Sequence, residues 1–128
     1  MKLILPFIPP TANHTQKHAL RGKHITRYNT TVYRQFIDRV QYYLYQQSDL
    51  NAFHKFLKSP HKVTISVHSP KVLTKKGEVS KTFGDVDNFV KPLLDAVYKP
   101  LNANDALVMQ VTASKHHGNE EYTVIEWF

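Results

Sequence analysis

The chain has 128 residues, 41% of them hydrophobic and 12% aromatic, which suits one folded domain with its own core. Seventeen lysines and arginines against ten acidic residues give a formal net charge of +7, which favours a polyanionic partner such as nucleic acid. The chain has no cysteine, signal peptide or apolar run near the roughly 20 residues of a membrane span, so we expect a cytoplasmic protein without disulfides.

The N-terminal third predicts a strand, a basic loop and a helix. Residues 2–7 (KLILPF) form a short apolar run that Pro9 and Pro10 end. Residues 11–28 are basic and lack clear periodicity, so we expect a long loop that an anionic partner orders. Thr30 or Thr31 can cap the next segment, in which apolar residues recur at helical spacing as far as residue 47. That segment is predicted to be a helix that packs on the core.

The remaining residues predict a mixed sheet and a second helix. Residues 62–69 alternate apolar and polar side chains, as a half-buried strand does, and an irregular hairpin or basic arm turning at Gly77 follows. A helix is expected at about 88–99, and strands at 107–117 and 121–128. We therefore predict a single α+β domain over residues 1–128, with a mixed β-sheet covered by two helices in the order β-α-β-(β)-α-β-β.

Residues 84–97 (GDVDNFVKPLLDAV) allow two interpretations. In the first, Asp87, Lys91 and Asp95 lie at successive i, i+4 positions on the polar side of a helix and form ordinary surface ion pairs. However, Pro92 lacks the N–H that would bond the carbonyl of Asn88, so the helix either begins near Phe89 or bends there.

A late helix start would leave two carboxylates close together. Asp85 and Asp87 would then share one face of an extended segment and repel each other unless a cation lay between them. Hard cations such as Mg²⁺ prefer oxygen ligands of this kind. Asp105, in an asparagine-rich turn before an apolar strand, is a candidate third ligand.

Four features together resemble the RusA-type Holliday junction resolvases, which are small dimeric endodeoxyribonucleases common in phages and prophages. LPFIPPTAN is similar to the opening strand, proline pair and asparagine of that family, here Pro9, Pro10 and Asn13. DVDNFVKPLLDAV is similar to its Asp-x-Asp-Asn-x-x-Lys-x-x-x-Asp-Ala core, and NDALV resembles its later aspartate-containing turn. The order of strands and helices also agrees.

The resemblance implies a catalytic site and a reaction. Asp85, Asp87 and Asp105 would bind the catalytic Mg²⁺, for which Mn²⁺ would substitute, and Lys91 would assist at the scissile phosphate. A homodimer would resolve four-way DNA junctions by paired symmetric nicks in recombination and repair, without a small-molecule cofactor or a membrane. The chain departs from the family pattern at Asn104, where an acid is common, and at residues 81–84 (KTFG), where arginines are common.

The predicted DNA contacts are basic residues in two segments, together with the asparagine of the first motif. They are Asn13, Lys17, Arg21, Lys23, Arg27, Lys71, Lys75, Lys76 and Lys81. Two other functions remain open at this point. The chain is alternatively a non-catalytic basic nucleic-acid-binding module, or a small metal-dependent nuclease that acts on other branched DNA.

Overall fold

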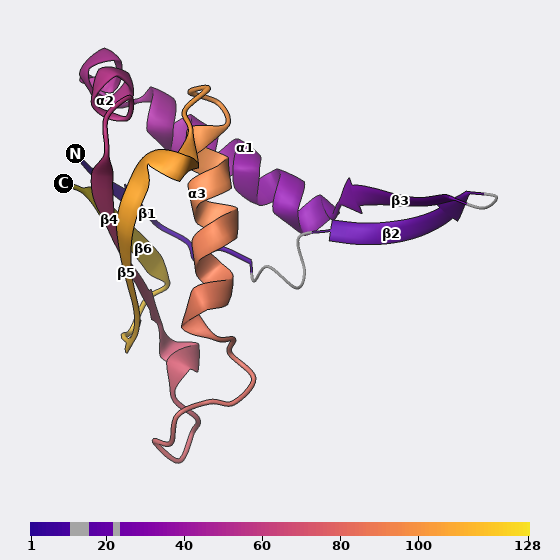
Figure 1. The fold of residues 1–128 in the computed structure, drawn as a ribbon. Helices are drawn as coiled ribbons and strands as arrows, with labels where there is room; N and C mark the ends of the chain where they lie inside the picture. Colours follow the sequence, from indigo (N-terminus) through magenta and orange to yellow (C-terminus); the bar gives the residue numbers. More distant parts are fainter. Residues whose placement is uncertain (11–15, 22–23) are drawn as a thin grey trace.

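The central element is a four-stranded mixed sheet, seen in a computed structural model that describes residues 1–10, 16–21 and 24–128 (Figure 1). β4 pairs in parallel with β5, whereas the β1–β6 and β4–β6 pairs are antiparallel. In sheet order the strands are β1 (Lys2–Leu5), β6 (Tyr122–Trp127), β4 (His61–Ser69) and β5 (Val108–His117). The predicted α+β class with a mixed sheet is confirmed.

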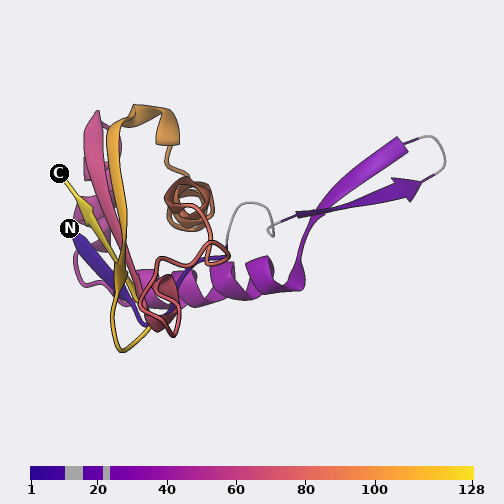
Figure 2. The ribbon, with the colours of Figure 1, turned by 90° about the horizontal axis from the view of Figure 1, so that it is seen from below.

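The described residues form three α-helices, of which two were predicted. α1 (Thr31–Tyr45) is capped by Thr30, whose hydroxyl accepts a bond of 3.2 Å from the Tyr33 amide. α3 (Val90–Tyr98) lies with α1 on one face of the sheet (Figure 2). α2 (Leu50–Phe56) was not predicted, because seven residues make too few turns to show a helical period. No helix in the described ranges has the length and apolar character needed to cross a membrane.

The core lies between the inner face of the sheet and helices α1 and α3. Alternate residues of each inner strand are buried, as in the pair Val63 and Ile65 of β4, because successive side chains of a strand point to opposite faces. They pack against apolar side chains of the two helices, among them Val40 and Leu93, which are both 0% exposed. Burial of each such side chain stabilises the fold by about 1.5–3 kcal/mol.

The expected basic loop at residues 11–28 is instead largely a β-hairpin. β2 (Gln16–Arg21) pairs antiparallel with β3 (His24–Asn29), and the hairpin extends away from the four-stranded sheet beside the start of α1 (Figure 1). The expectation of a loop is therefore wrong for these two ranges. The strands contain few apolar residues, so the alternation that identifies a strand is weak in this part of the sequence.

The arm after β4 is an irregular hairpin, as predicted. A 3-10 turn (Pro70–Val72) follows β4, and Leu73 then forms an isolated antiparallel bridge with Val79. The chain reverses at Gly77, whose φ of +79° is a conformation that glycine adopts without steric cost. The arm returns the chain toward the motif that contains Asp85 and Asp87.

A buried hydrogen-bond network joins β4, α3 and β6 at one end of the sheet. His61, Tyr98 and Trp127 are each no more than 3% exposed. The Ser59 carbonyl lies 2.7 Å from His61 Nδ1 and can only accept, so Nδ1 carries the proton. The Tyr98 hydroxyl therefore donates to His61 Nε2 at 2.6 Å and accepts from Trp127 Nε1 at 3.1 Å. Every polar side-chain atom of the network has a partner.

Alkaline pH is expected to destabilise the protein through Tyr98. Burial raises the pKa of Tyr98 from 10.0 to about 12, although the hydrogen bond from Trp127 acts in the opposite direction. The folded protein holds this proton more tightly than the unfolded chain, so the stabilisation is complete below pH 10 and is lost between pH 10 and 12. The loss amounts to about 3 kcal/mol.

Urea unfolding at stepped pH, for the wild type and for Tyr98→Phe, measures this effect. For each protein, the free energy of unfolding is plotted against pH. Other tyrosines and lysines titrate in both proteins, so only the difference between the slopes of the two plots reports Tyr98. Equal slopes above pH 10 would contradict the assignment.

Candidate active site

Asp85 and Asp87 lie on a 3-10 turn that leads into α3. Asp85 has an extended backbone and precedes the turn Val86–Phe89, which is closed by a bond of 3.1 Å from the Asn88 amide to the Asp85 carbonyl. The late helix start is confirmed, because Pro92 falls in the first turn of α3, where no N–H is needed. The expectation that both aspartates lie on one face of an extended strand is wrong, because the backbone turns between them.

The acidic turn, residues 84–89, is attached to the body of the protein on its inner side. Phe89 is 2% exposed, and its ring contacts that of Phe83 with centroids 5.5 Å apart. The Lys115 ammonium, from β5, donates a bond of 3.1 Å to the Gly84 carbonyl. Asp85 and Asp87 are themselves exposed. The turn is thus anchored by its apolar and backbone groups and presents its two carboxylates to solvent.

Lys91 connects the helix to the later aspartate-containing turn. Its ammonium lies 3.0 Å from Asp95 Oδ1 and 3.1 Å from Asp105 Oδ2. The bond to Asp95, followed by that to Asp105, raises the pKa of Lys91. The predicted pair with Asp95 is confirmed. The second partner is Asp105, fourteen positions along the chain, and not Asp87.

Asn104 has a structural role in the turn that contains Asp105. Its side-chain oxygen accepts a bond of 2.9 Å from the Ala106 amide and so caps the 3-10 turn Asp105–Leu107. This cap holds Asp105 near α3, with its side chain 41% exposed. An asparagine oxygen serves as a cap as well as a carboxylate does.

The three predicted metal ligands are not gathered into one group. Across residues 1–10, 16–21 and 24–128, no three histidine, aspartate or glutamate side chains are placed to hold a metal ion together. Asp105 is bonded to Lys91, while Asp85 and Asp87 are exposed on their turn. Accessible carboxylates do fit the oxygen preference of a hydrated divalent cation. The metal role of Asp85, Asp87 and Asp105 therefore stays a prediction.

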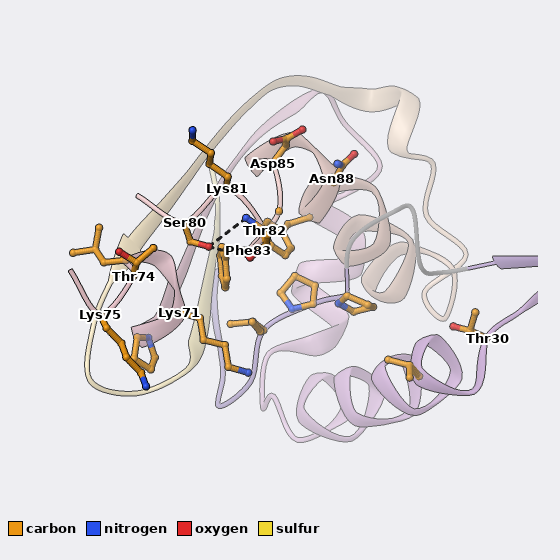
Figure 3. A pocket seen from close by; sticks show the side chains of 18 of the residues that line it. Thr30, Lys71, Thr74, Lys75, Ser80, Lys81, Thr82, Phe83, Asp85 and Asn88 are labelled. Carbon is orange, nitrogen blue, oxygen red and sulfur yellow. Dashed lines mark hydrogen bonds between the residues drawn. The ribbon is translucent and has the colours of Figure 1, made fainter. Parts of the chain in front are cut away.

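An open groove of about 1220 Å³ adjoins the acidic turn (Figure 3). Its charged lining residues are three lysines and one aspartate, Asp85, so the groove favours anions. Hydroxyl and apolar side chains complete its walls. The lining includes Pro9, Pro10, Lys71, Thr74, Lys75, Ser80, Lys81, Thr82, Phe83 and Asp85.

The predicted DNA-binding residues fall into three groups. Lys71, Lys75 and Lys81 line the groove, whereas Lys76 is exposed in the turn of the arm and is not part of the lining. The strands of the hairpin contain Lys17, Arg21 and Arg27, and residues 30–32, which directly follow β3, form part of the groove wall. Asn13 and Lys23 lie outside the described residues.

Sequence reasoning did not single out Lys115 as part of this site. Lys115 is in phase with Val111 and Ala113 on β5, so it faces the same side of the sheet as these apolar residues. The sequence did contain one indication of this role, namely a lysine that continues the alternating apolar positions Val111 and Ala113.

Comparison with known proteins places the chain in a family. A sequence model of the family described as Endodeoxyribonuclease RusA matches residues 6–126, which contain the acidic turn, the groove and the turn of Asp105. A search among curated proteins found no match. Because the family match spans nearly the whole chain, the protein belongs to the RusA family of endodeoxyribonucleases.

Proposed function

We propose that the protein is a metal-dependent endonuclease that resolves four-way DNA junctions by paired symmetric nicks, in recombination and repair. The observation that carries the proposal is an exposed pair of aspartates beside a groove lined by three lysines, in a chain of the RusA family. Figure 3 shows Asp85 and Asn88 along one side of the groove, and Lys71 and Lys75 along the other. Such an arrangement suits a phosphodiester strand that passes beside the carboxylates.

The proposed metal ligands are Asp85, Asp87 and Asp105, holding Mg²⁺ or, as a substitute, Mn²⁺. A divalent cation held by such carboxylates polarises a phosphate oxygen and makes a bound water more acidic. The exposure of Asp85 and Asp87 supports this role, because a hydrated cation and a DNA strand can reach both side chains. Asp105 would have to exchange its bond to Lys91 for the cation.

Lys91 is proposed to stabilise the negative charge that develops on the phosphate during hydrolysis. An ammonium is a compact point charge that suits this task. Its present partners, Asp95 and Asp105, hold it at the N-terminal half of α3. If Asp105 bound the cation instead, Lys91 would keep its bond to Asp95 and would have N–H groups free for a phosphate oxygen. Asp95 thus acts as a structural partner of Lys91 in this proposal.

The proposed reaction requires two active sites. Resolution of a four-way junction places one nick in each of two opposed strands, and a two-fold homodimer presents two identical sites for them. We therefore propose a homodimer that acts on DNA in the cytoplasm. Each nick would leave a 5′-phosphate and a 3′-hydroxyl, which DNA ligase can seal.

A comparison of substrates tests the proposed function. Four-way, flap and linear duplex DNA of matched sequence are incubated with the protein and Mg²⁺, and the nicked products are then treated with ligase. We expect symmetric, ligatable nicks in the four-way junction and at least tenfold slower cutting of the other substrates. Equal cutting of flaps would favour a general branched-DNA nuclease. Binding without any cutting would favour a non-catalytic module.

Replacement of the groove lysines is expected to weaken DNA binding in a salt-dependent manner. In the triple variant Lys71→Ala, Lys75→Ala and Lys81→Ala, each lost phosphate contact lowers the slope of log K against log salt by about 0.7–0.9. The magnitude of the slope should therefore fall by about 2–3, as measured by fluorescence anisotropy at several salt concentrations.

A matched control removes the same charge elsewhere. The control uses three exposed lysines near the start of β4, namely Lys55 in α2, Lys58 just after α2, and Lys62 in β4. The groove lysines instead follow the C-terminal end of β4. Alanine at these three positions should change the slope by less than about 0.7. Equal slopes in the two triple variants would show that the groove does not contact DNA.

A further inference from the structure

Lys115 occupies a position on β5 where an apolar side chain is expected. In the parallel pairing of β4 and β5, Lys115 lies opposite Val67, just as Val111 and Ala113 lie opposite Val63 and Ile65. Residues that oppose each other in neighbouring strands project from the same face. Since Val67 is 1% exposed on the inner face, Lys115 also projects from the inner face. β5 is an edge strand and Lys115 is half-buried there, so its aliphatic stem can cover apolar surface while its charged group reaches a polar partner.

The partner of Lys115 is the backbone of the acidic turn. Its Nζ donates to the Gly84 carbonyl at 3.1 Å, and this bond is partly buried. The ion pairs found within the described part of the chain involve only Lys91 and Lys99 as cations. The Lys115 ammonium is therefore directed at a main-chain carbonyl and not at a carboxylate.

The bonded carbonyl belongs to the peptide group that leads into Asp85. Gly84 has a φ of +121°, a backbone conformation that residues other than glycine rarely adopt. Because glycine has no side chain to restrict the backbone, the adjacent peptide group is free to rotate. Rotation of that peptide group would redirect the Cα–Cβ bond of Asp85. The Phe83–Phe89 contact and the bond from the Asn88 amide to the Asp85 carbonyl hold other parts of the turn. Lys115 holds the peptide group itself.

We propose that Lys115 is a positioning residue that orients Asp85 and Asp87 for a divalent cation by fixing the Gly84–Asp85 peptide group. The inference rests on the proposed function in one respect, namely that these two aspartates bind a metal. The contact of Lys115 with Gly84 and its effect on the turn are independent of that function. Lys115 need not touch the DNA or the cation.

The experiment uses the full chain with Lys115→Met, Lys115→Arg and the control Lys62→Met, which removes one positive charge at an exposed position of β4. Solvent exchange of the Asn88 amide, measured by NMR, reports the order of the turn. Titration with Mn²⁺ in the absence of DNA reports metal affinity. The Mn²⁺ concentration for half-maximal junction cutting reports the metal requirement of the active enzyme. All variants are compared at temperatures where thermal unfolding shows them to be folded.

For Lys115→Met we expect at least fivefold faster exchange at Asn88 and about tenfold weaker Mn²⁺ binding, with a matching rise in the Mn²⁺ needed for cutting. Lys115→Arg, which keeps a cationic donor, should recover metal affinity to within threefold of the wild type. The control Lys62→Met should match the wild type throughout. A residue that only stabilised the fold would lower the melting temperature without changing the metal affinity of the folded protein.

Unchanged exchange at Asn88 in Lys115→Met would overturn the positioning contact. Faster exchange with unchanged Mn²⁺ affinity would overturn its link to metal binding. A wild-type protein that neither binds Mn²⁺ nor cuts DNA would overturn the proposed function and the metal-binding part of this inference together. In that case the exchange rates would still decide whether Lys115 holds the turn.

Discussion

Asp87→Asn is expected to lower magnesium-dependent cutting of a four-way junction by about a thousandfold or more, equivalent to about 4 kcal/mol in the activation free energy. Asparagine keeps the shape of the side chain but removes the negative charge that a divalent cation requires. Asp87 is exposed, so the substitution should leave the fold intact. Single-turnover cutting in Mg²⁺ gives the rate, and gel shifts in Ca²⁺ or EDTA give the affinity for DNA, which should change by no more than about twofold.

The matched control for this prediction is Asp38→Asn on α1. Asp38 is also exposed, and the substitution removes the same charge away from the acidic turn. The Asp38→Asn protein should cut the four-way junction at the wild-type rate. If Asp87→Asn also cuts at the wild-type rate, Asp87 is not a metal ligand. If it loses DNA binding in Ca²⁺, its main role is structural.

Tyr98→Phe is expected to lower the free energy of unfolding by about 2–4 kcal/mol. The substitution removes one hydroxyl and leaves both His61 Nε2 and Trp127 Nε1 buried without their observed partner. Each unsatisfied buried group costs about 1–3 kcal/mol. The ring itself remains, so little apolar burial is lost. Urea unfolding measures the change, which for a chain of this length corresponds to a fall of roughly 10 °C in melting temperature.

Tyr42→Phe provides the comparison. Tyr42 is 61% exposed, so loss of its hydroxyl should change the free energy of unfolding by less than about 0.5 kcal/mol. A Tyr98→Phe protein as stable as the Tyr42→Phe protein would mean that the buried network contributes little. Activity per folded molecule should stay close to the wild type in both variants, because neither hydroxyl belongs to the proposed active site.

Local sequence patterns predicted the elements with strong periodicity. The alternation at residues 62–69 identified β4, and helical spacing after Thr30 identified α1 with its cap. Pro92 limited α3 to two possibilities, a start near Phe89 or a bend, because its missing N–H is tolerated only in the first turn of a straight helix, and the structure shows the late start. The β2–β3 hairpin and the short α2 were missed, because neither is long and amphipathic enough to show a period.

The sequence by itself determined which carboxylates and lysines are available, together with their spacing in the acidic turn and α3. It did not determine that Lys91 pairs with Asp105, that Lys115 holds Gly84, or that residues 8–10, 30–32, 73–75 and 80–85 contribute walls to one groove. The pattern of neighbouring residues reflects local backbone preferences. Contacts between distant residues depend on how the sheet and helices pack, so only the tertiary structure decided which charged groups meet.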